Sequence, residues 1–186
     1  MTSSYKPEDI AVYNERALTR LAWAIEASEG QFSIFLAHCN YGKSRTQLAK
    51  RLQEICSTQI RVVALPETAR TLYTTLLDAL GDEQPGAVMV LGLESVSDLE
   101  QVLVATNQVR EEFRKKFPFP LVLWVNDEVL EKLIRLAPDF ENWTTTTEFA
   151  VATETLKDDL RQRADDLFEK ILDLGADLFS SGEPLY

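Results

Sequence analysis

The residues of this chain whose types and spacing could do chemistry begin with Gly42, Lys43 and Ser44. They follow a short apolar run and precede an amphipathic segment, which is the context in which a Gly-x4-Gly-Lys-Ser/Thr loop, or P-loop, holds phosphate groups. Backbone amides and the helix N-terminus cradle the phosphates, the lysine neutralises the terminal ones, and the hydroxyl holds magnesium. The expected nucleotide-contacting residues are Ala37, Tyr41, Gly42, Lys43 and Ser44.

This loop departs from the motif in two ways. Ala37 stands where the motif has its first glycine, and alanine tolerates a positive φ poorly. Tyr41 is a bulky loop side chain that either stacks on a base or fills space over the sheet. The competing interpretation of the whole segment is a chance Gly-Lys-Ser at the start of a helix, where serine is a common cap.

Two further polar residues stand at the ends of apolar runs. Glu94 follows VMVLGL, where a carboxylate can hold magnesium or polarise an attacking water. Asn126 follows LVLWV, where an amide can sense the γ-phosphate. Glu94 and Asn126 are therefore the candidate catalytic residues, and Ser44 and Glu94 the candidate magnesium contacts. The alternatives are a solvated glutamate at a loop start and a helix cap formed by Asn126 or Asp127.

The elements that must position these residues alternate in type. Apolar residues at helical spacing predict helices over residues 8–28, 44–56, 67–80, 97–116 and from 127 to about 137. Short apolar runs predict strands at 32–37, 60–65, 87–93 and 121–125, and a fifth strand is expected at 147–151. Strands with few polar residues, each followed by a helix, predict a three-layer α/β/α sandwich with a mostly parallel five-stranded sheet and additional N- and C-terminal helices. Ligands of such sheets bind at the carboxyl ends of the strands, where Lys43, Glu94 and Asn126 fall.

A last helix is predicted at about residues 154–179. Its apolar residues recur at alternating spacings of four and three, and they are Leu160, Ala164, Leu167, Ile171, Leu174 and Leu178. This spacing is typical of a narrow apolar seam that packs on the domain, on a partner protein or on a second copy of the chain. The aspartates of this segment lie mostly off the seam and are expected to form a solvated face. We therefore divide the chain into a P-loop-type domain, residues 1–152, and a C-terminal helix and tail, residues 153–186.

Composition narrows the classes of partner. The net charge of −11 disfavours binding to nucleic acid, because the basic residues around Lys43–Arg45 and Arg110–Lys116 form only local clusters. The apolar runs are too short to span a bilayer, and the first residues lack the apolar core of a secretory signal, so a cytoplasmic location is expected. Two cysteines are too few for a disulfide framework, and one histidine argues against a zinc site.

The second half of the chain resembles a known family. The residues that carry the resemblance are Gly92-Leu93-Glu94, Asn107, Arg110-Glu111, Trp124, and Ala137-Pro138-Asp139-Phe140 with Trp143. They are similar to motifs of the signal-transduction ATPases with numerous domains (STAND), AAA-like switch NTPases that are fused to repeat or effector modules. The resemblance covers roughly residues 30 to 152 and is more specific in its second half than at the P-loop.

The resemblance implies an ATP- or GTP-binding core with magnesium that acts as a regulatory switch. It assigns Gly42, Lys43 and Ser44 to the phosphates and magnesium, Glu94 as the Walker B acid and Asn126 as the sensor. Ala37 and the single acid at Glu94 imply weak or no hydrolysis, so NTPase activity stays open. The alternative is a degenerate domain of the same fold that no longer binds nucleotide and serves as a protein-interaction or scaffold module.

Overall fold

A five-stranded, all-parallel sheet forms the centre of the part of the chain that the computed structural model describes, residues 7–151 and Phe168. The predicted helix at 154–179 and the boundary at residue 152 lie, apart from Phe168, outside the described residues. The strands stand in the order β2-β3-β4-β1-β5 and every pair is parallel. They span Ser33–His38 (β1), Ile60–Ala64 (β2), Ala87–Leu91 (β3), Pro120–Val125 (β4) and Thr144–Glu148 (β5).

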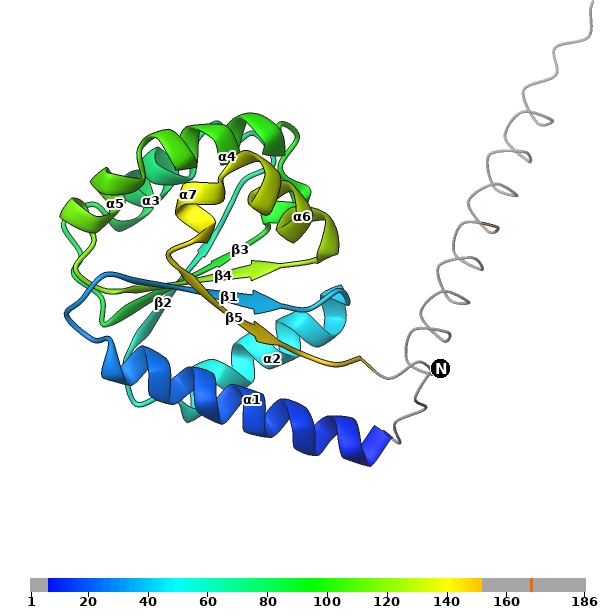
Figure 1. Cartoon of the computed structure of the whole chain (residues 1–186). Coiled ribbons are helices and arrows are strands. Elements are labelled where there is room, and N and C mark those ends of the chain that lie inside the picture. The colour runs from blue at the N-terminus through cyan, green and yellow to red at the C-terminus, as the bar shows by residue number, and fades with distance from the viewer. Residues whose placement is uncertain (1–6, 152–167, 169–186) are drawn as a thin grey trace, which may run out of the picture.

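Helices cover both faces of this sheet (Figure 1). One face carries α1 (Pro7–Ala27) and α2 (Gly42–Ile55). The other carries α3 (Leu72–Leu80), α4 (Leu99–Gln108), α5 (Arg110–Lys116), α6 (Asp127–Leu136) and α7 (Pro138–Glu141). The predicted three-layer α/β/α sandwich is therefore confirmed. In the described part of the chain no helix is both long and apolar enough to cross a bilayer.

The burial of the strands follows their place in the sheet. All six residues of β4 are buried, and β1 and β3 are buried except at their ends, because helices cover both sides of these central strands. The edge strands β2 and β5 expose residues along their length. Buried apolar runs therefore identified the central strands correctly.

The fifth strand was predicted at 147–151, and that position is wrong. Residues Thr144–Glu148 form β5, which pairs with β1 from Ile34↔Thr144 to His38↔Glu148. The prediction followed the apolar residues that begin at Phe149, whereas an edge strand needs no apolar run. Threonine is β-branched and suits a half-exposed strand, so pairing with β1 selects TTTTE.

Two predicted helices also have different limits. The helix expected at 97–116 consists of α4 and α5, because Val109 leaves the helical region at φ −103° and ψ 16°. Helix α3 begins at Leu72 rather than near residue 67, because the Thr71 side chain caps it by accepting a hydrogen bond from the Thr74 amide.

Candidate functional site

The three candidate segments meet at the carboxyl edge of the sheet. The P-loop segment follows β1, Glu94 follows β3 and Asn126 follows β4, and these strands are neighbours in the order β3-β4-β1. Glu94 does not end its strand as predicted: β3 stops at Leu91, Gly92 takes a positive φ of 92°, and Glu94 lies in a 3-10 turn (η1, Leu93–Ser95). Topology therefore places the candidate segments together, as the sequence predicted.

The loop between β1 and α2 is short and extended. Strand β1 continues through Ala37, which is fully buried and lies opposite Trp124 of β4. Tyr41, at the cap position of α2, has an extended backbone and a buried side chain. Among the described residues only Gly30, Gly81 and Gly92 have a positive φ. The loop therefore lacks the alternation of right- and left-handed residues that turns successive amides toward an anion.

Side chains of this loop are bonded to the start of α6. The Asn40 amide donates to Asp127 Oδ2 (2.8 Å), and Asn40 Oδ1 accepts from the Asp127 backbone amide (2.7 Å). His38 Nε2 lies 2.7 Å from Asp127 Oδ1. These contacts, the Asn40 amide first, hold the pKa of Asp127 below its usual value. The loops after β1 and β4 are thus tied to each other by protein groups.

Glu94 forms an ion pair with Arg45. Arg45 is in the first turn of α2, and its side chain exposes 7% of its surface against 28% for Glu94. Its Nη1 contacts Glu94 Oε1 and its Nε has no hydrogen-bond partner, so the Glu94 carboxylate is the countercharge for a nearly buried guanidinium. Sequence reasoning gave Arg45 no role, because its burial, and with it the need for a carboxylate partner, is visible only in the tertiary structure.

Ser44 lies on another side of α2. It lines a hollow of about 230 Å³ between α1 and α2, with Asn14, Glu15, Gln47 and Arg51 among its neighbours. Glu94 is not part of that lining. The two predicted magnesium contacts are therefore not brought to one hollow, and the described residues contain no cluster of three His, Cys, Asp or Glu placed to hold a metal ion.

The remaining predicted residues divide between structural and exposed positions. Asn126 caps α6, because its Oδ1 accepts a hydrogen bond from the Val129 amide at 2.9 Å. This is the helix-cap interpretation that the sequence offered beside a γ-phosphate sensor. Gly42 and Lys43 are exposed at the start of α2. The roles of Gly42, Lys43 and Ser44 toward phosphate remain predictions.

Cys39 lies inside this loop but is not placed as a nucleophile. Its side chain is buried, its Sγ lies 3.6 Å from the Tyr41 carbonyl oxygen, and burial raises the pKa of the thiol. A raised pKa leaves little thiolate at neutral pH.

Four of the residues that carry the family resemblance, Asn107, Arg110, Asp139 and Phe140, contact one another between α4, α5 and α7. Asn107 Oδ1 accepts from the Phe140 amide (3.0 Å), and the Asn107 amide donates to Asp139 (3.3 Å). Arg110 donates to the Asn107 carbonyl (3.0 Å) and lies 3.5 Å from Asp139. These residues therefore hold α7 against α4 and α5.

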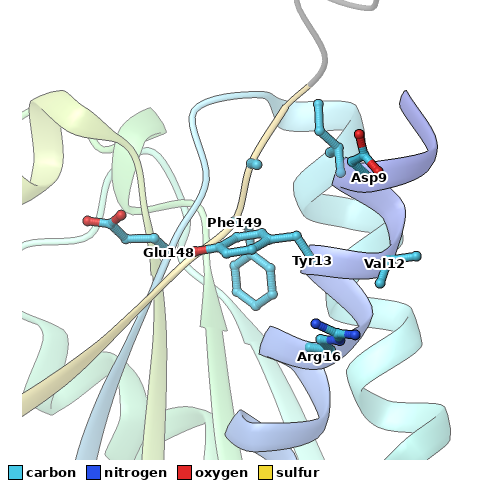
Figure 2. Close-up of a pocket in the computed structure, with 8 residues that line it drawn as sticks. Asp9, Val12, Tyr13, Arg16, Glu148 and Phe149 are labelled. Carbon is cyan, nitrogen blue, oxygen red and sulfur yellow. The ribbon is translucent and has the colours of Figure 1, made fainter. Parts of the chain in front are cut away.

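A larger hollow lies elsewhere, between α1 and the end of β5. It measures about 700 Å³ and is lined mainly by Asp9, Val12, Tyr13 and Arg16 of α1 with Glu148 and Phe149 (Figure 2). Tyr13 also lines two adjoining hollows, of about 390 and 530 Å³, that reach β5 and Trp23. We call this surface the α1–β5 groove. Sequence reasoning missed it, although Val12, Tyr13 and Trp23 stand off the apolar face of α1.

Comparison with known protein families and with curated proteins finds no match. Among solved structures the chain is similar to the ORC2 protein of Aeropyrum pernix in its ADP form, with 14% identity and a TM-score of 0.45. The match covers 88% of this chain and 53% of that one, so the chain spans about half the length of that neighbour. The class of the fold rests on the molecule itself: a three-layer α/β/α sandwich with an all-parallel five-stranded sheet, in which Gly42-Lys43-Ser44 begin α2 after β1.

Proposed function

We propose that the chain is a P-loop NTPase-like domain that no longer binds a magnesium–nucleotide and serves as a protein-interaction module. The observation that carries the proposal is the ion pair between Arg45 and Glu94. It places a nearly buried guanidinium beside the carboxylate that a magnesium site would use.

Electrostatics explains why this pair excludes magnesium. Two like unit charges about 4 Å apart repel by about 4 kcal/mol at an effective dielectric of about 20, and magnesium carries two charges. Removing Glu94 from Arg45 would also leave the guanidinium buried without a countercharge, which is strongly unfavourable. Ser44, the second expected magnesium contact, faces α1 and adds nothing at this point.

The phosphate side of the site supports the same proposal. The loop has no residue with positive φ, and Asn40 ties it to Asp127. To wrap a phosphate, the loop would have to break these hydrogen bonds and rebuild its backbone. Each lost hydrogen bond to a charged group costs about 1.5–3 kcal/mol, which opposes nucleotide binding.

The interaction role is supported by the α1–β5 groove. Val12, Tyr13 and Trp23 expose 52%, 43% and 66% of their surface, and they lie along one side of α1. Apolar and aromatic side chains grouped beside hollows are typical of protein-binding surfaces, whereas single exposed apolar residues are ordinary.

A STAND-type regulatory switch that binds ATP or GTP with magnesium, with weak or no hydrolysis, is the second candidate. The observation that favours it is the exposure of Gly42 and Lys43 at the N-terminus of α2. This helix has 14 residues, and its dipole favours an anion at that end.

Titration of the full chain with ATP, ADP, GTP and GDP, with and without magnesium, separates the two candidates. The interaction module is expected to give no binding heat and no change in Tm up to millimolar nucleotide. A switch domain would gain about 2.7 kcal/mol of stability at 100 times its Kd. Micromolar binding that Lys43→Ala abolishes, and that Lys50→Ala on the same helix leaves unchanged, would overturn the proposal.

A further inference from the structure

The α1–β5 groove lacks a cover among the described residues. Its hollows share Tyr13, and the groove extends along α1 to Trp23, whose side chain is 66% exposed. On its other side lies β5, which pairs only with β1 in the described sheet. The groove is thus an apolar surface between a helix and a sheet edge.

The chain itself leaves the described domain at this groove. Asn14 of α1 holds Ala150 by two hydrogen bonds, accepting from the Ala150 amide and donating to its carbonyl oxygen, each 2.9 Å long. Ala150 lines the hollow of about 700 Å³, and the continuous stretch of described residues ends one residue later at Val151. Residues 152–186 therefore start at the end of the groove.

The segment is long enough to cover the groove. The stretch of α1 from Val12 to Trp23 measures about 17 Å, and the seam from Leu160 to Leu178 would measure about 27 Å as a helix. With the helix predicted from about residue 154, the extended connection from Ala150 spans up to about 14 Å, and the helix from there to Leu160 adds about 9 Å, so the seam can start at the end of the groove and run along it.

Charged side chains of both signs line the groove: Arg16 and Arg20 lie beside Asp9, Glu15 and Glu148. The segment 152–186 holds more aspartate and glutamate than lysine and arginine. Arg16 and Arg20 are therefore the groove side chains that an acidic segment can contact favourably, and charge adds nothing further to the choice of occupant. Phe168, the described residue of the segment, exposes 65% of its surface.

We propose that the α1–β5 groove is the docking site for the chain's own segment 152–186, bound through the seam formed by Leu160, Ala164, Leu167, Ile171, Leu174 and Leu178. The proposal rests on the proposed function, because it names the occupant of the same interaction surface. A tethered segment binds at an effective concentration of about 1 mM, so even a Kd of about 10 µM keeps the groove about 99% occupied. Another protein can then bind the α1–β5 groove only by displacing this segment, so the segment inhibits binding of other proteins to the groove.

Acrylamide quenching of Trp23 in the full chain tests the docking. The seam variant Leu167→Asp/Ile171→Asp is expected to raise the quenching of Trp23 by about twofold or more, since docked interface cores exclude most solvent. Thr155→Asp/Gln162→Asp adds the same charge off the seam and is expected to leave quenching unchanged. In a Trp23→Phe background the seam substitutions should have no effect, which assigns the signal to this residue.

A groove-side variant keeps the test valid if the seam variant aggregates. Arg16→Glu/Arg20→Glu changes exposed side chains and is expected to release the acidic segment and raise Trp23 quenching as well. Equal quenching in the wild type and in both variants would overturn the docking. Quenching that falls with concentration together with dimer formation in sedimentation would overturn it in favour of a second copy. Nucleotide binding is measured separately, so each proposal can fail without the other.

Discussion

Replacing Glu94 by glutamine distinguishes an ion-pair partner from a magnesium ligand. Glu94→Gln keeps the size of the side chain and removes its charge. If Glu94 balances Arg45, the substitution leaves a guanidinium that is 7% exposed without a countercharge. If Glu94 is instead a magnesium ligand, the substitution changes nucleotide binding and leaves the free energy of unfolding nearly unchanged.

The magnitude follows from burial and charge. Opposite unit charges about 4 Å apart attract by about 4 kcal/mol at an effective dielectric of about 20. Breaking a buried pair costs about 3–5 kcal/mol in measured cases. Glu94 is 28% exposed, so water screens part of this attraction, and glutamine still accepts a hydrogen bond. We therefore expect Glu94→Gln to lower the free energy of unfolding by about 2–3 kcal/mol.

Urea unfolding at pH 7, followed by circular dichroism, measures this loss. The matched control is Glu100→Gln, because Glu100 pairs with Arg135 (3.2 Å) and both side chains are about 60% exposed. An exposed pair contributes about 1 kcal/mol or less, so the control is expected to stay close to the wild type. The double variant Arg45→Met/Glu94→Leu removes both charges and is expected to recover most of the lost stability.

Two results would refute the reasoning. A Glu94→Gln variant as stable as Glu100→Gln would mean that the ion pair contributes nothing. A double variant less stable than Glu94→Gln would mean that the aliphatic part of the Arg45 side chain, rather than its charge, holds α2 against η1.

Three further predictions concern groups around the site and the core. Contacts lower the pKa of Asp127, so the small stabilisation by its carboxylate is present above about pH 4 and is lost as the pH falls through the folded-state pKa. The urea midpoint is expected to differ less between pH 7 and pH 3 in Asp127→Asn than in the wild type. An equal difference in the two proteins would contradict this. Cys39 and Cys56 are buried and their thiol pKa values are raised, so dithionitrobenzoate at pH 8 should label them only after unfolding, and rapid labelling of the native protein would contradict their burial. Phe113 is fully buried, and the centroids of three other aromatic rings lie 5.2–5.7 Å from its own. Phe113→Ala is therefore expected to lower the free energy of unfolding by about 3–5 kcal/mol in urea experiments. The control is Tyr13→Ala, at a residue 43% exposed, which is expected to lower it by about 1 kcal/mol or less.

The class of fold could be predicted from the sequence because its signals are local. Apolar runs such as those of β1, β3 and β4 are buried on both sides, and only a parallel sheet between two helix layers buries strands in this way. The position of Gly42 at a strand-to-helix junction and the cap formed by Asn126 follow from the same local rules.

The edge of the sheet could not be predicted in this way. Strand β5 exposes two of its four threonines and buries none of them fully, and its backbone pairing with β1 joins residues more than a hundred positions apart in the chain. The α1–β5 groove depends on that pairing, since Thr145–Thr147 and Glu148 form its sheet side.

The sequence by itself determined that a Gly-Lys-Ser turn begins α2 beside the carboxyl ends of three strands. Only the tertiary structure decided which side chain of that helix meets Glu94. Successive residues of a helix point about 100° apart, so Ser44 and Arg45 present their side chains in different directions. Arg45 shares the buried face with Ala49 and Leu52, because packing those apolar residues against the sheet fixes the rotation of α2. That rotation turns Arg45 toward Glu94 and Ser44 toward α1.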